Sequence, residues 1–242
     1  FRFFEFFFIS KFFTNKIIVT SREYIQSSIF LKYNRNKIVV LPSPLEIEKF
    51  KPKKLKNKKI KKIFFVGRLV NYKGLQYLIK SASILKKKRN DFRVYIIGDG
   101  PLKDFLIKIT KRFNLEKFVI FLGKLRNDDV IKLLKKDCDI FVLPSVYRSE
   151  ALGMSMVEAM AIGIPVVSTK IKGSGVVFVN KNNITGFVVE PRNSLKLAQA
   201  LDKLLNDFEL RKKFGQNGRK RTLKLFNLNS YVKKLIKIYK VI

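Results

Sequence analysis

The sequence contains no histidine, and Cys138 is the only cysteine among its 242 residues. Without histidine, the chain cannot use an imidazole as a metal ligand, as a general base or as the partner of a nucleophilic serine. A single cysteine also excludes an internal disulfide framework, and it fits a reducing compartment. Any catalytic site in this chain must therefore be built from other residue types.

Acidic residues are scarce as well. The chain has 18 Asp and Glu against 52 Lys and Arg, which gives a formal net charge of +34. Such a balance favours an anionic partner, but the lysines are scattered over almost every segment, as coding bias would leave them. We therefore favour bias together with a weak attraction to anionic membranes over a dedicated nucleic-acid role. The aromatic residues lie mostly in apolar strands and helices, where we expect core packing rather than stacking on bases.

The chain begins with Phe1 rather than with methionine, so we expect it to belong to something larger or to have been cut. Its first 13 residues, FRFFEFFFISKFF, are rich in phenylalanine but are interrupted by Arg2, Glu5 and Lys11. These charges argue against a membrane span, and the segment does not resemble a signal peptide. We predict a buried or interfacial helix here.

Two apolar segments, 16–20 and 37–41, predict strands. A helix that Ser21 caps should join them and run to about Leu31. Residues 51–62 are rich in lysine, a composition typical of an exposed linker. We place a domain boundary there.

From this boundary on, short apolar strands alternate with amphipathic helices. The predicted strands are 63–67, 93–98, 118–123, 139–143, 164–168 and an edge strand at 186–190. The predicted helices are 74–87, 101–113, 127–136, 152–162 and 194–206, followed by 207–226 and 228–241. Nearly all-apolar strands that helices separate indicate a parallel sheet buried on both faces. The predicted fold class is therefore α/β, a Rossmann-like doubly wound parallel sheet.

The stretch with the most chemical content runs from Val142 to Val167. It consists of a strand end, a polar loop with Glu150, a glycine (Gly153) that opens a helix, and Glu158 inside that helix. This order of elements builds ligand pockets at the carboxyl ends of strands. Each glutamate taken alone is also compatible with an ordinary surface acid.

Several α/β chemistries can be excluded at this point. The G-D-G run at 98–100 lacks the third glycine of a dinucleotide fingerprint, and the sequence has no G-x-x-x-x-G-K-[ST] phosphate loop. Glu150 and Glu158 would lie up to about 12 Å apart along a helix that rises ~1.5 Å per residue. The paired carboxylates of glycosidases lie about 5 to 9.5 Å apart, so the spacing of Glu150 and Glu158 argues against a glycosidase.

The remaining groups suit a sugar nucleotide. Arg68 and Lys73 follow the first strand of the sheet, where both could reach one pyrophosphate. Two solvated cations are an equally good interpretation of this motif alone. The helix after Gly153 would aim N–H groups at an anion. Glu150 and Glu158, which a diphosphate would repel, should instead accept hydrogen bonds from ribose or hexose hydroxyls.

Four segments resemble a known family: GRLVNYKG, IIGDGP, FLGKL and EALGMSMVEAMAIGIPVV. They are similar to the nucleotide-sugar half of retaining glycosyltransferases of family 4 (glycosyl transferases group 1), which have the GT-B fold. The E-x7-E motif of that family stands at Glu150 and Glu158. The resemblance covers about residues 15–242, and its first part is similar to the end of the family's N-terminal domain.

The resemblance implies a role for each matching residue. Arg68 and Lys73 would hold the donor's diphosphate. Glu158 would bind the ribose hydroxyls, and Glu150 would contact the transferred sugar. The implied catalytic residues are Arg68, Lys73 and Glu150, and the implied donor-binding residues are Gly67, Arg68, Lys73, Gly98, Lys124, Leu125, Arg126, Glu150, Leu152, Gly153, Met154 and Glu158. The backbone of 124–126 would meet the base, and Leu152, Gly153 and Met154 would line the loop under the diphosphate and sugar.

The resemblance also implies a mechanism. The family retains the anomeric configuration, needs no metal or other cofactor, and uses the leaving diphosphate to help deprotonate the acceptor on the same face. Stabilising that leaving group would be the main catalytic task. The sequence departs from the family pattern at Leu152, where Phe is commoner, at Phe178 in the loop 171–187, where many members carry an acid, and at Pro44 and Glu46, where Gly and Asp are usual.

We therefore predict a retaining glycosyltransferase that moves a sugar from a nucleoside diphosphate sugar to a glycan or lipid-linked acceptor in cell-surface polysaccharide or glycolipid synthesis. Its expected place is cytoplasmic, peripheral at the inner face of the cell membrane. Residues 1–50 would be a remnant of the acceptor-side N-terminal domain, 51–226 the nucleotide-sugar domain, and 227–242 a helix that crosses back. On this assignment the chain would lack most of the acceptor-binding domain, which leaves the activity of this chain alone open. The alternatives are a non-catalytic nucleotide-sugar-binding fragment and, less favoured, a basic nucleic-acid-binding protein.

Overall fold

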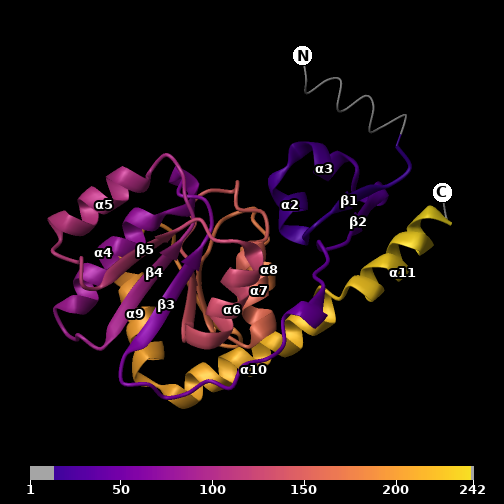
Figure 1. Ribbon diagram of the computed structural model, residues 1–242. Coiled ribbons are helices and arrows are strands. Elements are labelled where there is room, and N and C mark those ends of the chain that lie inside the picture. The colour runs from indigo at the N-terminus through magenta and orange to yellow at the C-terminus, as the bar shows by residue number, and fades with distance from the viewer. Residues whose placement is uncertain (1–13, 241–242) are drawn as a thin grey trace.

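The computed structural model describes residues 14–240, which contain two sheets of parallel strands (Figure 1). In the smaller sheet, β1 (Ile17–Val19) pairs with β2 (Ile38–Val40). The larger sheet has the order β5-β4-β3-β6-β7-β8. Its strands are β3 (Lys61–Val66), β4 (Phe92–Ile97), β5 (Val119–Gly123), β6 (Ile140–Leu143), β7 (Val166–Thr169) and β8 (Gly186–Val189). This order runs outward from β3 and β6, as in a Rossmann fold, and it confirms the predicted fold class and the six predicted strands.

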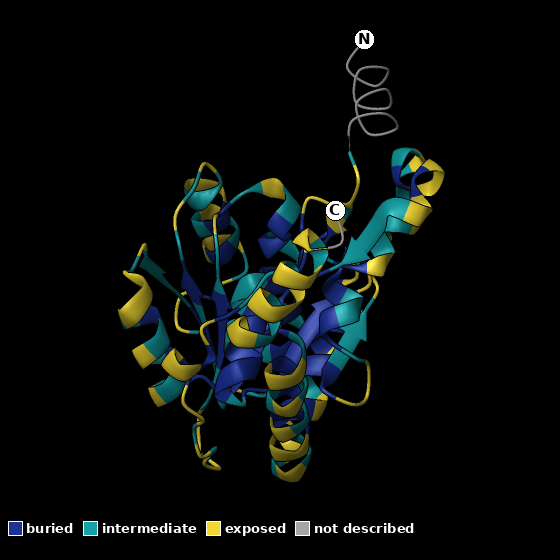
Figure 2. Cartoon of the chain, turned by 90° about the vertical axis from the view of Figure 1, so that its right-hand side faces the viewer, coloured by how far each residue is buried: buried dark blue, intermediate teal, exposed yellow. Residues whose placement is uncertain are grey.

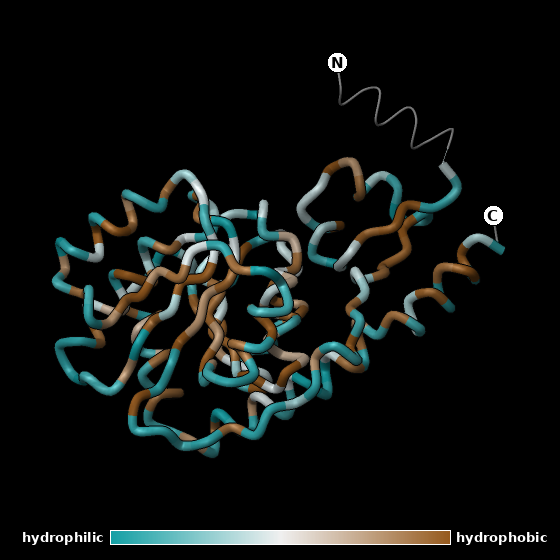
Figure 3. Tube along the Cα trace, in the orientation of Figure 1, coloured by the Kyte–Doolittle hydropathy of each residue, from teal (hydrophilic) through white to brown (hydrophobic). Residues whose placement is uncertain are grey.

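The central strands are buried because their side chains are apolar on both faces. Ile63, Phe64 and Phe65 of β3 have no exposed surface, and all four residues of β6 are buried. β3 and β6 lie side by side with Ile63 opposite Ile140. Figure 2 shows the buried centre, and Figure 3 shows that the hydrophobic residues follow the strands. Burial of these strands therefore anchors the loops that leave their carboxyl ends.

Helices cover both faces of the larger sheet (Figure 1). They are α4 (Leu75–Lys86), α5 (Lys103–Arg112), α6 (Asn127–Asp137), α7 (Met154–Ile162), α9 (Ser194–Asn206), α10 (Phe208–Leu225) and α11 (Leu228–Tyr239). α4 packs against α5 and α9, whereas α7 packs against α6 and α10. All seven were predicted. The loop 171–187 also contains a short helix, α8 (Val176–Val179), which four apolar residues are too few to reveal by periodicity.

The helix predicted between the first two strands is wrong in one respect. Two short helices, α2 (Arg22–Ser27) and α3 (Ile29–Tyr33), replace it. Between them the backbone of Ser28 is extended, and its hydroxyl accepts a hydrogen bond from the Leu31 N–H at 3.4 Å. Ser28 therefore ends one helix and caps the next, whereas the side chain of Ser21 makes no capping hydrogen bond. The helix predicted over residues 1–13 lies outside the described residues.

The lysine-rich segment 51–62 is mostly exposed, as its composition predicted, and it has no helix or strand before Lys61, but Lys53 ties it to the larger domain. Lys53 donates hydrogen bonds to the carbonyl oxygens of Cys138, at 2.7 Å, and Leu134 at the end of α6. Burial lowers the pKa of this lysine. Its long apolar stem allows it to lie along the protein while the ammonium group satisfies helix-end carbonyls. The last two residues of the segment already belong to β3.

The chain crosses twice between the small sheet and the large one (Figure 1). The first crossing follows β2, and the second leads from α10 into α11. They are joined by a hydrogen bond of 2.7 Å from the Leu45 N–H to the Phe226 carbonyl oxygen and by a bridge between Leu45 and Asn227. Arg219 of α10 also donates to the carbonyl oxygens of Phe50, at 2.7 Å, and Ala161. The two crossings therefore form one connection.

The loops after β3 and β4 approach each other closely at Gly98. Its φ is +137°, and a Cβ at this position would overlap the carbonyl oxygen of Gly67. We predict that Gly98→Ala lowers the free energy of unfolding by more than about 2 kcal/mol, because backbone strain and overpacking add. The control is Gly123→Ala, where φ is +69° but nothing lies within 4 Å of the added carbon. Urea unfolding of both variants measures the difference, and equal losses would contradict the reason given.

Candidate functional site

The site lies at the point in the larger sheet where the strand order reverses, between β3 and β6. β3 and β6 are neighbours, but the connections that follow them return on opposite faces of the sheet. Such a switch point leaves a crevice beyond the carboxyl ends of the two strands, where ligands of open α/β sheets bind. The loop 67–74 after β3 and the loop 144–153 after β6 form this crevice.

A buried ion pair joins these two loops. The Nζ atom of Lys73 lies 2.6 Å from Oε2 of Glu150, and the two residues are 8% and 5% exposed. The hydroxyl of Ser145 donates to the same Oε2 atom at 2.6 Å. Among residues 14–240 no donor reaches Oε1 of Glu150, so this second oxygen is available to a ligand.

Hydroxyl groups hold the backbone around this pair. Ser174 donates to the carbonyl oxygen of Glu150, and Thr169 donates to the carbonyl oxygen of Ser145. The Gly175 N–H adds a hydrogen bond of 2.7 Å to the Ala151 carbonyl oxygen. Buried polar groups that are satisfied in this way are rigid. The loop that carries Glu150 is therefore fixed from the side of β7.

Two further features of the crevice suit an anion. Arg68, directly after β3, is exposed. α7 begins after Gly153, whose φ is +72° and whose added Cβ would overlap the side chain of Leu143 in β6. Only glycine allows the start of α7 to pack so closely on the strand. The unpaired N–H groups of its first turn are thereby brought to the crevice.

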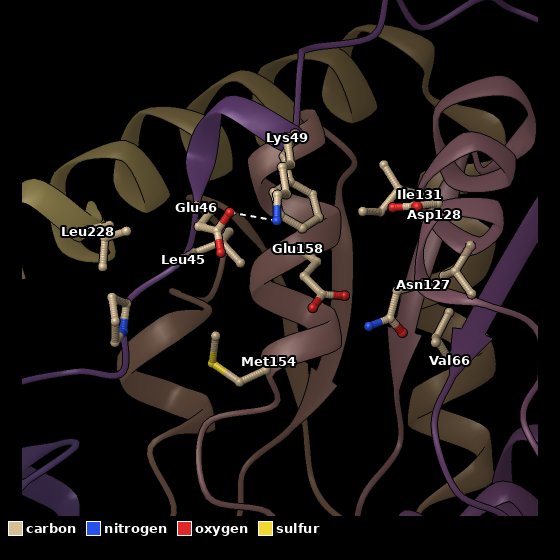
Figure 4. Close-up of a pocket in the computed structure, with 13 residues that line it drawn as sticks. Leu45, Glu46, Lys49, Val66, Asn127, Asp128, Ile131, Met154, Glu158 and Leu228 are labelled. Atoms are coloured by element: carbon tan, nitrogen blue, oxygen red, sulfur yellow. Dashed lines mark ion pairs between the residues drawn. The ribbon is translucent and has the colours of Figure 1, made fainter.

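Glu158 lies in a separate cleft of about 570 Å³ (Figure 4). The cleft is lined by Pro44, Leu45, Glu46, Lys49, Phe50, Val66, Asn127, Asp128, Val130, Ile131, Met154, Glu158 and Leu228. Burial raises the pKa of Glu158 above its ordinary value. No hydrogen bond or ion pair engages its carboxylate within the described part of the chain. Its oxygens are therefore open acceptors facing the cleft.

The family described as Glycosyl transferases group 1 matches residues 46–221, which include both loops and most of the residues that line the cleft. The chain belongs to this family. Among curated relatives, this group 1 glycosyltransferase chain is 30% identical over 229 residues to the O-antigen chain mannosyltransferase C of Escherichia coli, covering 92% of this chain and 60% of that protein. It is 33% identical over 181 residues to an uncharacterized glycosyltransferase of Methanocaldococcus jannaschii, covering 75% and 45%. The chain therefore spans about half the length of these relatives.

Solved structures confirm the fold of the group 1 glycosyltransferase chain. The C-terminal domain of a glycosyl transferase group 1 family protein from Francisella tularensis is 29% identical, with a TM-score of 0.67, and the match covers 76% of this chain and 99% of that one. Anabaena HepE in complex with UDP has a TM-score of 0.85 at 20% identity, covering 97% and 65%. The predicted GT-B donor domain is thus the fold observed.

The predicted site residues divide into two groups in this glycosyltransferase chain. Lys73 and Glu150 come together, whereas Glu158 lines the cleft, and no hydrogen bond or ion pair of the described residues joins it to that pair. Gly67 and Gly98 meet at the ends of β3 and β4. The two glutamates of the E-x7-E motif therefore lie in different places, Glu150 between the two loops and Glu158 in the cleft.

The other predicted residues lie around these places. Lys124 and Arg126 are exposed in the loop before α6, and Leu125 is half-buried. Arg126 pairs with Asp129 at 3.0 Å. Leu152 is buried, and Met154 lines the cleft beside Glu158.

Sequence reasoning missed the hydroxyl groups and one wall of the cleft. Ser145 was not selected, although a serine at the carboxyl end of a buried strand, five residues before Glu150, is a usable signal. Thr169 and Ser174 gave no such signal, because they reach the site from the next strand and its loop. The wall that Glu46 and Lys49 form depends on the path of the first crossing, which no local pattern predicts.

The buried pair makes a prediction about stability. Lys73→Met should lower the free energy of unfolding by about 3 to 5 kcal/mol, because it leaves the Glu150 carboxylate buried without its partner. Adding Glu150→Gln to that variant should recover much of the loss, because the uncompensated charge is gone. Urea unfolding of the two single variants and the double variant gives the coupling energy. Additive losses would show that the two side chains do not depend on each other.

Proposed function

We propose that the chain is the donor-binding part of a retaining glycosyltransferase that transfers a sugar from a nucleoside diphosphate sugar to a glycan or lipid-linked acceptor. The observation that carries the proposal is the Lys73–Glu150–Ser145 cluster beside the exposed Arg68. It combines cations for a diphosphate with a fixed carboxylate oxygen for a sugar hydroxyl. No part of it could act as a histidine base, because the chain has none.

In this proposal each group has a task. Arg68, Lys73 and the first turn of α7 hold the two phosphates. As the bond between the sugar and the diphosphate breaks, negative charge grows on the leaving oxygen, and these fixed positive groups stabilise it. The Oε1 atom of Glu150 accepts a hydrogen bond from a hydroxyl of the departing sugar. Lys73 and Ser145 hold the other carboxylate oxygen of Glu150, Oε2, in place. Arg68, Lys73 and Glu150 are the catalytic residues in this proposal.

The nucleoside half of the donor occupies the cleft. Glu158 accepts hydrogen bonds from the ribose hydroxyls, and hydrogen bonds to a charged carboxylate are strong. The base lies near the backbone of 124–126. Met154, Leu152 and Gly153 form the floor between the cleft and the crevice. Neither a metal nor another cofactor is required, since cations and helix N–H groups neutralise the diphosphate.

Cell-surface polysaccharide or glycolipid synthesis is the setting that we propose. The name of the Escherichia coli relative refers to an O-antigen chain, and the name of another relative, from Staphylococcus aureus, refers to capsular polysaccharide biosynthesis. The non-catalytic nucleotide-sugar-binding fragment remains the second candidate, because this chain spans about half of such proteins. A nucleic-acid role is less favoured, since Phe64, Phe65, Phe92 and Phe141 are buried in the core and cannot stack on bases.

Attachment to the inner face of the cell membrane is part of the proposal. No helix within residues 14–240 combines the length and the hydropathy that a membrane span requires. α11 supports peripheral attachment, because it exposes apolar side chains next to lysines, as helices that lie on anionic membranes do. The exposed apolar residues are Leu228, Val232, Ile236 and Tyr239, and the neighbouring lysines are Lys233, Lys234 and Lys237.

The first test concerns the phosphate cation. In titrations with chelator present, we expect the chain to bind nucleoside diphosphates and their sugars, and Arg68→Ala to weaken both by about 10- to 150-fold, because a charge-assisted hydrogen bond is lost. The affinity for the free nucleoside should not change, because a nucleoside has no phosphate. Arg112→Ala, which removes an exposed arginine at the end of α5, is the matched control. If the folded protein binds none of these nucleotides, the proposed function fails.

The second test uses pH. A charged Glu158 accepts ribose hydroxyls better than a protonated one, so affinity is complete above the pKa of Glu158 and is lost as the pH falls through it. Because burial raises this pKa, the loss should begin at a higher pH than an ordinary glutamate would give. Calorimetric titration of a nucleoside diphosphate between about pH 4 and 8 measures it. Glu158→Gln keeps any titration of the phosphates, so only the difference between the two proteins counts. Parallel profiles would refute the role of Glu158.

A further inference from the structure

Acidic side chains gather in the cleft that contains Glu158, although acids are rare in this chain. Of its 18 Asp and Glu residues, Glu46, Asp128 and Glu158 line the cleft. Lys49 is the basic residue among those that line it, and it is paired with Glu46 at 2.6 Å. The cleft therefore offers hydrogen-bond acceptors and suits a ligand that is rich in N–H and O–H donors.

Asp128, in the first turn of α6, is the exposed acceptor opposite Glu158 whose carboxylate makes no close contact among the described residues. Its neighbour Asp129 pairs with Arg126 at 3.0 Å and approaches Lys132 at 4.0 Å. Throughout residues 14–240, by contrast, no ion pair or hydrogen bond involves the carboxylate of Asp128. Figure 4 shows Asp128 and Asn127 on one wall and Glu158 on the facing wall, with the amide of Asn127 pointing into the space between them.

The walls between these polar groups suit a flat ring. Val66, Val130 and Ile131 supply apolar surface from β3 and α6. A volume of about 570 Å³ falls in the range of small-molecule sites. Glu158 at one wall and the start of α6 at the other leave room for a ribose followed by a base. This placement rests on the proposed function, in which the cleft holds the nucleoside half of the donor.

We propose that this cleft selects guanine, with Asp128 as the residue that recognises it. Guanine has two adjacent donors, the N1–H and the 2-amino group, and one carboxylate can accept from both. The amide of Asn127 can donate to the O6 carbonyl next to them. The inferred donor substrate is therefore a guanosine diphosphate sugar.

The other bases match the acidic wall less well. Uracil carries a single N–H between two carbonyl oxygens, which a carboxylate repels. Adenine and cytosine each present one amino group next to a ring nitrogen that is an acceptor. None of them offers a carboxylate two adjacent donors, so each leaves part of its hydrogen-bonding capacity unsatisfied.

Calorimetric titration of the full 242-residue chain with GDP, UDP, ADP and IDP tests the selection. GDP should bind about 10-fold or more tightly than UDP and ADP. IDP differs from GDP only by the missing 2-amino group and should bind more weakly than GDP. Tighter binding of UDP or ADP would overturn the assignment of the base while leaving the proposed function intact. If no nucleotide binds, both fail.

The residue is tested by Asp128→Asn, with Asp129→Asn as the matched control on the next residue. Asp128→Asn should weaken GDP about 10- to 150-fold, change UDP less than about twofold, and improve binding of xanthosine diphosphate. Xanthine carries a carbonyl where guanine has its 2-amino group, so an asparagine amide can donate to it. Asp129→Asn should leave all three ligands unchanged. Equal weakening of GDP by both variants, or no gain for xanthosine diphosphate, would overturn the role of Asp128.

Discussion

Lys73 and Glu150 come from loops after two neighbouring strands, and their charges meet where little water reaches them. Removing two ions from water costs several kcal/mol per ion, which only close contact and further hydrogen bonds can offset. Ser145 supplies such a bond to the carboxylate, and the loops around it are tied to β7. The pair can therefore form only if β3, β6 and β7 lie side by side. The sheet order of a Rossmann fold is the condition for this site.

The few acidic residues of this basic chain have two kinds of task. Some of them brace the fold. Arg89 donates hydrogen bonds to Asp91 and Asp202, and Arg89 together with Lys61 holds the pKa of Asp91 well below its ordinary value. Others, such as Glu158 and Asp128, form no ion pair within residues 14–240 and face a cleft. Where acids are rare, an acid that braces nothing is informative about ligands.

Much of the fold could be predicted from the sequence because it depends on local patterns. Apolar strands such as 139–143 and helices with regular spacing are visible without tertiary information. The break at Ser28 was missed, because a serine inside a helical pattern is neutral until its cap hydrogen bond is seen. The packing of Lys53 was missed because composition does not reveal which carbonyl groups lie nearby.

The candidate site was predictable to a similar degree. Arg68, Lys73, Glu150 and Glu158 could be named from motifs, since glycines and strand ends mark where such loops stand. That Lys73 and Glu150 form a pair could not be derived, because they are 77 residues apart in the sequence and meet only through the sheet order. The acidic wall of the cleft was equally hidden. Asp128 and Glu46 belong to different segments, and only the path of the first crossing brings them to one cavity.

The joined crossings determine how the small sheet can move. A single flexible segment would allow rotation in every direction. Here the hydrogen bond between Leu45 and Phe226 joins two chain segments side by side. Such a connection is a hinge with one axis. Bending about that axis keeps the hydrogen bond between the two segments, whereas twisting the segments against each other would stretch it. Glu46 and Lys49 belong to this hinge and also line the cleft. A rotation of the small sheet about this connection would therefore change the width of the cleft in which Glu158 stands.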